Sequence, residues 1–229
     1  DITTTAKPDE IKEVFKNYKI IDIGAKFGTI KVLDKENEYE ITSMRCESGY
    51  SDKRHPEKIA FTNDIIKDLQ RRDFTINAMA KRNGEILDPF DGKKDLENKI
   101  IRAVGNPDNR IKEDVLRSLR AVRFATSLDF NIEENLKSAI RKHAASIDEI
   151  SKERVQVEIN KILLADNQKR GIKILDDVGL LPYIFPEVYK TKGFNQHSSF
   201  HVDDLYNHTL SVLEKTPPIL EVRMAALYH

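Results

Sequence analysis

The hydrophobic pattern of the sequence changes from an alternating to a helical period near Gly92, and this change limits the fold more than any other feature. Before it, KIIDIG, FGTIKVL and YEITSM alternate as β-strands do, and PDEIKEVFKNY has helical spacing. The polar stretch RCESGYSDKRHPEKIAF is expected to form a loop before a short strand. The sequence therefore predicts an α+β fold, with a small sheet-based module followed by a helical one.

The helical part is clearest in IKEDVLRSLRAVRFATSL, where Ile111, Val115, Leu119 and Val122 recur at intervals of three and four. This spacing predicts one helix over residues 111–128. We expect further helices in EENLKSAIRKHAAS, SKERVQVEINKILLA, QKRGIKILDDVGLL and YNHTLSVLEKT.

Composition excludes several classes of protein. The chain has 38 Lys and Arg against 38 Asp and Glu, so any nucleic-acid binding must come from local basic patches. Its one cysteine, Cys46, rules out an intrachain disulfide and favours a reducing, cytoplasmic setting. No apolar run approaches the ~20 residues that a membrane helix needs, so we expect no membrane partner.

Three charged stretches are candidates for chemistry, and each has an ordinary structural explanation. Glu40 shares a strand face with Thr42, which is typical of a solvated edge strand, and spacing alone does not place Asp1 beside it. In RRDFTINAMA, Asp73 could cap the element that follows, or the three charges could bind a phosphate and a ribose.

The third stretch is KEDVLRSLRAVRF. At helical spacing, Glu113 and Asp114 are both neighbours of Arg117, as in ordinary surface salt bridges. Arg120 and Arg123 extend a basic line outside the apolar stripe, which could be solvated or could contact a phosphate backbone.

Taken together and in this order, these stretches resemble the class II tRNA nucleotidyltransferases, the CCA-adding enzymes of the polymerase β superfamily. The resemblance extends over the whole chain and includes DITTT, YEITSMR, the SDKRHP loop, RRDFTINAMA, DPFDGKKDLENKIIRAVG, KEDVLRSLRAVRFA and SKERVQVEINKIL. It implies an incomplete polymerase β-type nucleotidyltransferase head over residues 1–92, an all-α neck over 93–187 and the start of a helical, HD-like body over 188–229.

The resemblance also implies roles for individual residues. Asp1 and Glu40 match catalytic carboxylates that would hold Mg²⁺, a hard cation that takes oxygen ligands. The remaining residues match binding positions for the incoming nucleotide, namely Arg71, Arg72, Asp73, Asn77, Glu113, Asp114, Arg117, Arg120 and Arg123. The loop residues Asp52, Lys53, Arg54 and His55 match a flexible element implied in switching from C to A addition.

The sequence departs from the family pattern at both ends. The pattern places another aspartate and a glycine-rich segment before Asp1, so we expect the sequence to be a fragment that is impaired as given. The last residues resemble the opening of an HD phosphohydrolase-type domain, in which His208 and His229 would match two metal ligands. The alternative is that both are ordinary helix histidines.

Base selection follows from hydrogen-bonding chemistry. An Asp side chain only accepts and an Arg side chain only donates. Asp114 accepting from an amino group, with Arg117 donating to a ring nitrogen, suits both cytosine and adenine. Uracil and guanine present a carbonyl beside a ring N–H, which reverses both contacts and is rejected by a desolvated site. The family motif EDxxR assigns this role to Asp114 and Arg117, with Glu113 orienting the arginine.

The sequence therefore predicts an enzyme that adds C and A from CTP and ATP to the tRNA 3′ end. The alternatives are an A-adding enzyme or a poly(A) polymerase of the same family, or a non-catalytic tRNA-binding or HD-type hydrolytic remnant. The sequence leaves open the oligomeric state, the residues that bind the tRNA elbow and any hydrolase activity of the HD-like segment.

Overall fold

The structure is a computed structural model, and it describes residues 1–24, 27–50, 56–194 and 204–229. It divides into two compact units. Unit 1 consists of Asp1–Arg72 and Ala78–Pro89, and unit 2 of Asp73–Asn77 and Phe90–His229. The chain therefore passes from one unit to the other three times, because the short segment 73–77 belongs to unit 2 while its neighbours on both sides belong to unit 1.

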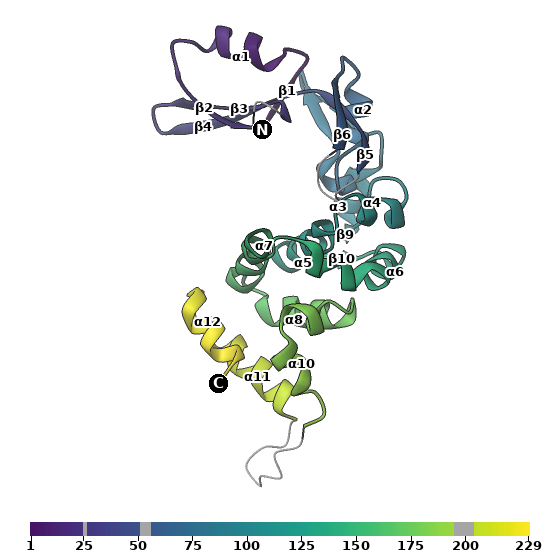
Figure 1. The fold of residues 1–229 in the computed structure, drawn as a ribbon, viewed down its shortest axis with the longest axis vertical. Coiled ribbons are helices and arrows are strands. Elements are labelled where there is room, and N and C mark those ends of the chain that lie inside the picture. The colour runs from purple at the N-terminus through teal and green to yellow at the C-terminus, as the bar shows by residue number, and fades with distance from the viewer. Residues whose placement is uncertain (25–26, 51–55, 195–203) are drawn as a thin grey trace. The chain divides into compact units, whose positions relative to one another are not determined.

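Unit 1 is built on a mixed sheet with one covered face (Figure 1). Its strands, in spatial order, are β1 (Ile2–Thr4), β4 (Asn37–Ser43), β3 (Thr29–Asp34) and β2 (Lys19–Gly24). β1 runs parallel to β4, and the other neighbours are antiparallel. Helix α1 (Pro8–Val14) contributes Ile11 to a small core with Ile30, Val32 and Ile41, so the alternate residues of β3 and β4 are left on the opposite face.

The structure corrects the sequence analysis at residues 45–50 and 56–61, where a loop before a short strand was expected. In the structure β5 (Arg45–Tyr50) pairs antiparallel with β6 (Pro56–Phe61). Few apolar residues occur in these strands, and Phe61 at the end of β6 is 40% exposed, so the alternating pattern that marks the other strands is missing here. The rest of unit 1 comprises α2 (Ile65–Gln70), β7 (Ala80–Arg82) and β8 (Glu85–Leu87).

Unit 2 is predominantly helical, as the sequence predicts. Its described α-helices are α3 (Gly92–Glu97), α4 (Pro107–Glu113), α5 (Leu116–Leu128), α6 (Glu134–His143), α7 (Lys152–Leu164), α8 (Gln168–Asp177), α9 (Leu181–Ile184), α10 (Pro186–Lys190), α11 (Leu205–Glu214) and α12 (Leu220–Leu227). The short elements are the 3₁₀ helices η2 (Thr75–Asn77) and η3 (Ala144–Glu149) and the parallel pair β9 (Ile100–Ile101) and β10 (Asn131–Ile132).

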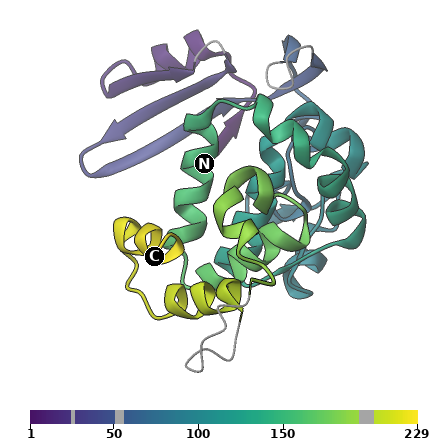
Figure 2. The same cartoon turned by 60° about the horizontal axis from the view of Figure 1, so that its bottom comes forward.

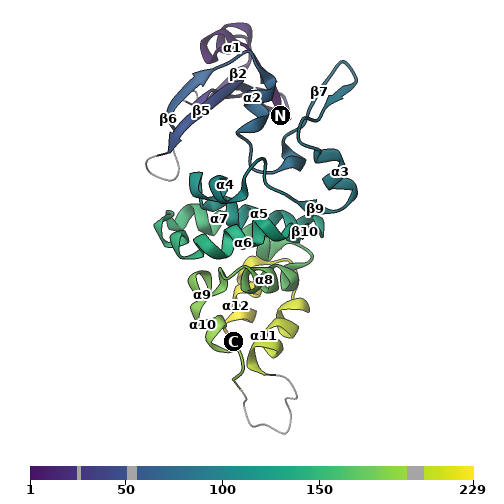
Figure 3. The ribbon, with the colours of Figure 1, turned by 90° about the vertical axis from the view of Figure 1, so that its right-hand side faces the viewer.

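One hydrophobic core runs through unit 2, from Phe74 to Leu227. Figures 2 and 3 show α12 beside α11, and α11 beside α8. Helices α5, α7 and α8 approach closely at Gly171, where a Cβ atom would lie 2.6 Å from Ile162 and 3.0 Å from Thr126. A glycine is therefore needed at this position to hold α5 against its neighbours.

The helix predicted over residues 111–128 is also corrected, because it is broken at Asp114. Asp114 is extended, with φ −152° and ψ 105°, and ends α4. Its carboxylate accepts a hydrogen bond from the Leu116 N–H at 3.0 Å, which is the kind of local contact that competes with helix formation. Periodicity could not detect the break, because Ile111 and Leu119 are fully buried on either side of it.

In the parts of the chain that the structure describes, no helix combines the length and hydrophobicity that a membrane crossing requires.

Candidate functional site

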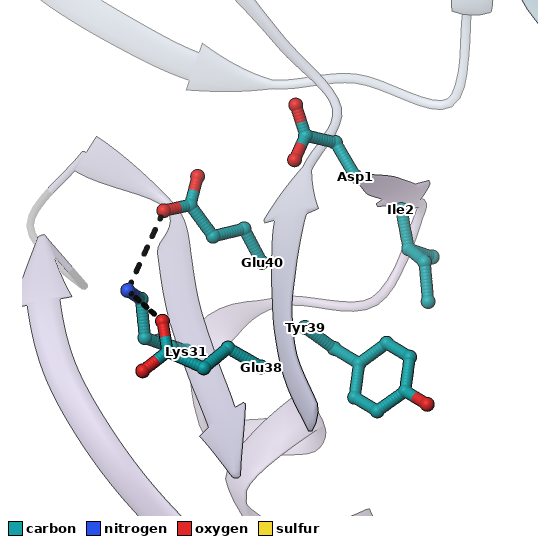
Figure 4. Close-up of a pocket in the computed structure, with 6 residues that line it drawn as sticks. All are labelled: Asp1, Ile2, Lys31, Glu38, Tyr39 and Glu40. Carbon is teal, nitrogen blue, oxygen red and sulfur yellow. Dashed lines mark hydrogen bonds and ion pairs between the residues drawn. The ribbon is translucent and has the colours of Figure 1, made fainter. Parts of the chain in front are cut away.

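The strand register of unit 1 brings Asp1 and Glu40 together. Ile2 pairs with Ile41 and Thr3 with Thr42 in parallel register, so Asp1 and Glu40 occupy equivalent places one step earlier. Equivalent residues on neighbouring strands point to the same face. Figure 4 shows the two carboxylates on one side of the sheet, with Ile2 and Tyr39 on the other. This juxtaposition was outside the reach of sequence spacing, because it depends on β1 inserting beside β4.

A pocket of about 210 Å³ lies at these two residues, and its other lining residues are Ile2, Lys31, Glu38 and Tyr39. The Lys31 ammonium lies 2.7 Å from a Glu38 oxygen and 3.9 Å from a Glu40 oxygen. The hydrogen bond that Lys31 donates to the Glu38 carboxylate raises the pKa of Lys31 above its ordinary value. The pocket therefore combines three carboxylates with one ammonium that stays charged.

The donor set at this pocket fits a magnesium ion. Mg²⁺ is commonly bound through one or two carboxylates, with waters and substrate phosphates completing its shell. Asp1 and Glu40 are both exposed and supply such a pair of oxygen ligands on one face. The described residues contain no group of three or more His, Cys, Asp or Glu side chains that could hold a metal, so phosphate or water oxygens would have to supply the other ligands.

Arg71 and Arg72 belong to unit 1 and pair with Asp68. Arg71 Nη2 lies 2.8 Å and Arg72 Nη2 3.3 Å from the Asp68 carboxylate, which is fully buried at the last turn of α2. Asp68 also accepts the Arg45 N–H at 3.1 Å. One buried carboxylate thus orients both guanidinium groups. Arg71 and Arg72 follow Asp68 by three and four positions, and this helical spacing could have predicted the pairing.

Asp73 belongs to unit 2 and is 8% exposed. One carboxylate oxygen accepts the Phe74 N–H at 2.9 Å and the Asn77 side-chain amide at 3.2 Å. The other accepts from Arg120 at 2.7 Å. Asp73 is therefore held in place both by the start of η2 and by a residue 47 positions away on α5.

Arg120 and Arg123 form a half-buried cluster with Glu158 of α7, rather than a solvated basic line. The Arg123 Nε lies 3.2 Å from Glu158, which is 5% exposed, and Arg120 lies 3.9 Å from it. The Arg123 guanidinium also lies 4.2 Å from the centre of the Phe124 ring. Burial lowers the pKa of Arg123, and Glu158 partly compensates.

Asp114 and Arg117 lie at the break between α4 and α5, and each has its own partner of opposite charge. Asp114 accepts from Arg154 of α7 at 2.7 Å. Arg117 pairs with Glu113 at 2.5 Å and also donates to the Arg110 carbonyl at 2.9 Å. The expected contact between Glu113 and Arg117 is present. The prediction that Asp114 and Arg117 share a helix face is wrong, because Asp114 lies outside both helices.

Two further groups of expected residues are those of the loop at residues 52–55 and the two histidines His208 and His229. Asp52, Lys53, Arg54 and His55 lie outside the described residues. The rings of His208, on α11, and His229, after α12, lie with their centres 5.4 Å apart. Proximity of two imidazoles is compatible with a metal site, and metal binding there stays a prediction.

Sequence reasoning missed four supporting residues: Lys31, Asp68, Arg154 and Glu158. Lys31 follows from the antiparallel pairing with Glu40, which the strand pattern alone could not fix. Arg154 and Glu158 come from α7, about 40 residues from the side chains they contact. No local signal relates Arg154 to Asp114 or Glu158 to Arg123, because these contacts depend on helix packing.

Comparison with known proteins places the chain in a family. Residues 1–102 match the family model of the poly A polymerase head domain, and residues 129–191 match that of a probable RNA and SrmB-binding site of polymerase A. The chain is 47% identical, over 80% of its length, to a CCA-adding enzyme of Limosilactobacillus reuteri, of which it covers 45%. The chain thus spans about half the length of the curated relatives it matches.

Solved structures agree with this assignment. A Bacillus stearothermophilus CCA-adding enzyme in complex with CTP is similar, with a TM-score of 0.70 and 36% identity over 78% of this chain and 42% of that one. A tRNA nucleotidyltransferase complexed with a primer tRNA and an incoming ATP analogue gives a TM-score of 0.66 at 25% identity, covering 91% of this chain and 56% of that one. These matches confirm the predicted α+β fold with a polymerase β-type head, and the chain belongs to the nucleotidyltransferase family that includes the CCA-adding enzymes.

Proposed function

We propose that the protein is a tRNA nucleotidyltransferase that adds C and A, from CTP and ATP, to the tRNA 3′ end. The observation that carries this proposal is the arrangement at the break between α4 and α5. There the two residues expected to select the base, Asp114 and Arg117, are each held by a separate oppositely charged residue. Related proteins bound to CTP, and to a primer tRNA with an ATP analogue, support the same substrates.

The chemistry of Asp114 suits recognition of an amino group. A carboxylate offers about four acceptor positions. The contacts with Leu116 and Arg154 use one position on each oxygen, so acceptor capacity is left for the amino group of cytosine or adenine. Arg154 pairs with this carboxylate and so fixes its direction, while Glu113 fixes the direction of the Arg117 fork. A uracil or guanine would bring a carbonyl oxygen against the carboxylate, which is repulsive.

The remaining assigned residues divide into catalytic and nucleotide-binding groups. In this proposal Asp1 and Glu40 hold Mg²⁺, which when bound activates the attacking 3′-hydroxyl and stabilises the leaving pyrophosphate. Arg71 and Arg72, oriented by Asp68, contact the triphosphate. Asp73 accepts from the ribose hydroxyls.

Asp73 can take this role because its partners fix its geometry. Asn77 and Arg120 hold the two carboxylate oxygens, so the side chain is preorganised before nucleotide binds. Arg123 supports Arg120 through their shared contact with Glu158 and adds positive charge. Switching from C to A by residues 52–55, the metal role of His208 and His229, and a cytoplasmic location remain parts of the proposal.

The test is incorporation of labelled CTP and ATP, supplied separately and together, onto tRNA transcripts that end before CCA, after C and after CC. We expect C addition to the first two transcripts and A addition only to the third. Incorporation of A alone on the CC transcript would instead indicate an A-adding enzyme, and repeated A addition a poly(A) polymerase. In a full-length preparation of the protein, binding of the transcripts without incorporation of either nucleotide would contradict the transferase and favour a tRNA-binding protein.

A further inference from the structure

Lys31 is the basic side chain among the residues that line the pocket at Asp1 and Glu40. It lies directly across from Glu40 in the antiparallel pairing of β3 with β4, and its ammonium is 3.9 Å from a Glu40 oxygen. Figure 4 shows this ammonium between Glu38 and Glu40. A carboxylate expected to ligate a metal ion therefore already has a cation of the protein within ion-pair distance.

The two carboxylates hold Lys31 unequally. Glu38 accepts a hydrogen bond from the ammonium at 2.7 Å, whereas Glu40 is at the outer limit of an ion pair. Glu38 pairs in the ladder with Leu33, so it is the diagonal neighbour of Lys31 and reaches back to it. Glu38 thus draws the ammonium toward itself and away from Glu40.

We propose that Lys31 is a positioning residue that competes with the divalent metal ion for Glu40, and that Glu38 limits this competition by holding the ammonium. The inference rests on the proposed function in one respect, namely that Glu40 is a metal ligand. Its physical basis is that a fixed positive charge beside a ligand weakens the binding of a second cation by Coulomb repulsion. When a metal ion binds Glu40, Lys31 remains paired with Glu38.

The experiment measures Mn²⁺ binding to the 229-residue chain without nucleotide, by the electron paramagnetic resonance signal of free Mn²⁺. Lys31→Met should tighten binding by about 3- to 10-fold, the size expected for one unit charge near a solvent-exposed ligand. Glu38→Gln should weaken binding by at least about threefold, because the released ammonium moves to Glu40. The competition therefore predicts that these two neighbouring substitutions change the Kd for Mn²⁺ in opposite directions.

The double variant separates the competition from a simple charge effect. If Glu38 acts by holding Lys31, then Glu38→Gln should change Kd by less than about twofold when Lys31 is already Met. An equal weakening in both backgrounds would mean that Glu38 acts on the metal directly, which overturns the proposed role of Glu38. An unchanged Kd in Lys31→Met and in Lys31→Gln would overturn the competition itself.

Two controls complete the design. Lys12→Met removes the same charge from an ion pair with Asp22 in unit 1, at 2.8 Å, away from the pocket lining, and should leave Kd unchanged. Glu40→Gln should abolish the Mn²⁺ binding. If Glu40→Gln binds Mn²⁺ like the parent, the metal-ligand assignment of the proposed function fails. If Glu40→Gln does not bind Mn²⁺ while Lys31→Met binds it with the Kd of the parent, only the inference about Lys31 fails. Circular dichroism of each variant checks that it is folded.

Discussion

The carboxylates of the unit 1 sheet face differ from those of unit 2 in burial and in pairing. Asp1 and Glu40 are exposed on an open strand face, and the Lys31 ammonium lies 3.9 Å from a Glu40 oxygen. Asp73 and Glu158 are 8% and 5% exposed and are paired with arginines of α5. The same chemical group is thus left available for an added cation in one unit and is neutralised by the protein in the other.

This difference separates effects on turnover from effects on stability. Removing one partner of a buried ion pair leaves an uncompensated charge and destabilises the fold, whereas an exposed carboxylate contributes little to folding. Substitutions on the unit 1 sheet face should therefore change chemistry alone. Substitutions in the unit 2 cluster should change stability as well.

The largest expected effect is that of Glu40→Gln on turnover. Loss of a metal ligand should lower kcat by at least ~10²-fold in an active preparation of the protein, while the free energy of unfolding changes by less than ~0.5 kcal/mol. The measurements are steady-state CTP incorporation and urea unfolding. Near-parent turnover would remove Glu40 from the metal site, and a large loss of stability would break the comparison.

Asp73→Ala should give the largest loss of stability. It leaves Arg120 without its 2.7 Å partner and removes the acceptor of the Phe74 N–H, so we expect about 2–4 kcal/mol of destabilisation in urea unfolding. Asp73→Asn keeps a side-chain oxygen for one of these contacts and should lose less. An unchanged free energy of unfolding in the alanine variant would mean that the buried contacts of Asp73 do not stabilise the fold.

Substitution of the base-selecting pair should appear mainly in nucleotide preference. Asp114→Ala should reduce discrimination against UTP and GTP, because their carbonyls no longer meet a carboxylate. Arg117→Ala should lower kcat/KM for both CTP and ATP. Each effect should be on the order of 1–3 kcal/mol, measured as kcat/KM for the four nucleotides. If all four ratios equal those of the parent, the two residues form ordinary salt bridges.

The smallest expected effect is that of Lys16→Met in unit 1. Lys16 pairs with Glu13 at 2.6 Å, yet both side chains are mostly exposed, so removal of the pair should change the free energy of unfolding by less than ~0.5 kcal/mol. Comparison with Asp73→Ala tests whether burial, rather than the presence of an ion pair, determines the energetic cost. A loss equal to that of Asp73→Ala would contradict this explanation.

Much of the fold could be predicted from sequence because hydrophobic periodicity reports on burial. The strands β2, β3 and β4 of unit 1 and the helices α6, α7, α8 and α11 of unit 2 follow from it directly. The pairing of β5 with β6 could not be predicted in this way, because the sequence of these two strands has no alternating apolar pattern. The break at Asp114 could not be predicted either, because the buried residues on both sides of it keep the helical period.

The candidate site was predictable only in part, for a related reason. Sequence spacing identifies neighbours within one element, such as Glu113 and Arg117, which are four positions apart. It cannot identify Arg154 as the partner of Asp114, or Asp1 as the neighbour of Glu40, since these contacts depend on helix packing and on strand insertion. The residues that hold the site in shape were therefore harder to find than the residues that are expected to act in it.

The assignment of residues 73–77 to unit 2 has a consequence for synthesis of the chain on the ribosome. Phe74 is fully buried and contacts Phe124 edge to face, 50 positions later. At the usual elongation rate those positions take about 3–10 s to synthesise. During that interval Phe74 lacks its partner, whereas residues 78–89, which complete unit 1, are all added before Phe124. Unit 1 can therefore begin to fold before Phe124 has been synthesised, whereas the burial of Phe74 in unit 2 has to wait for it.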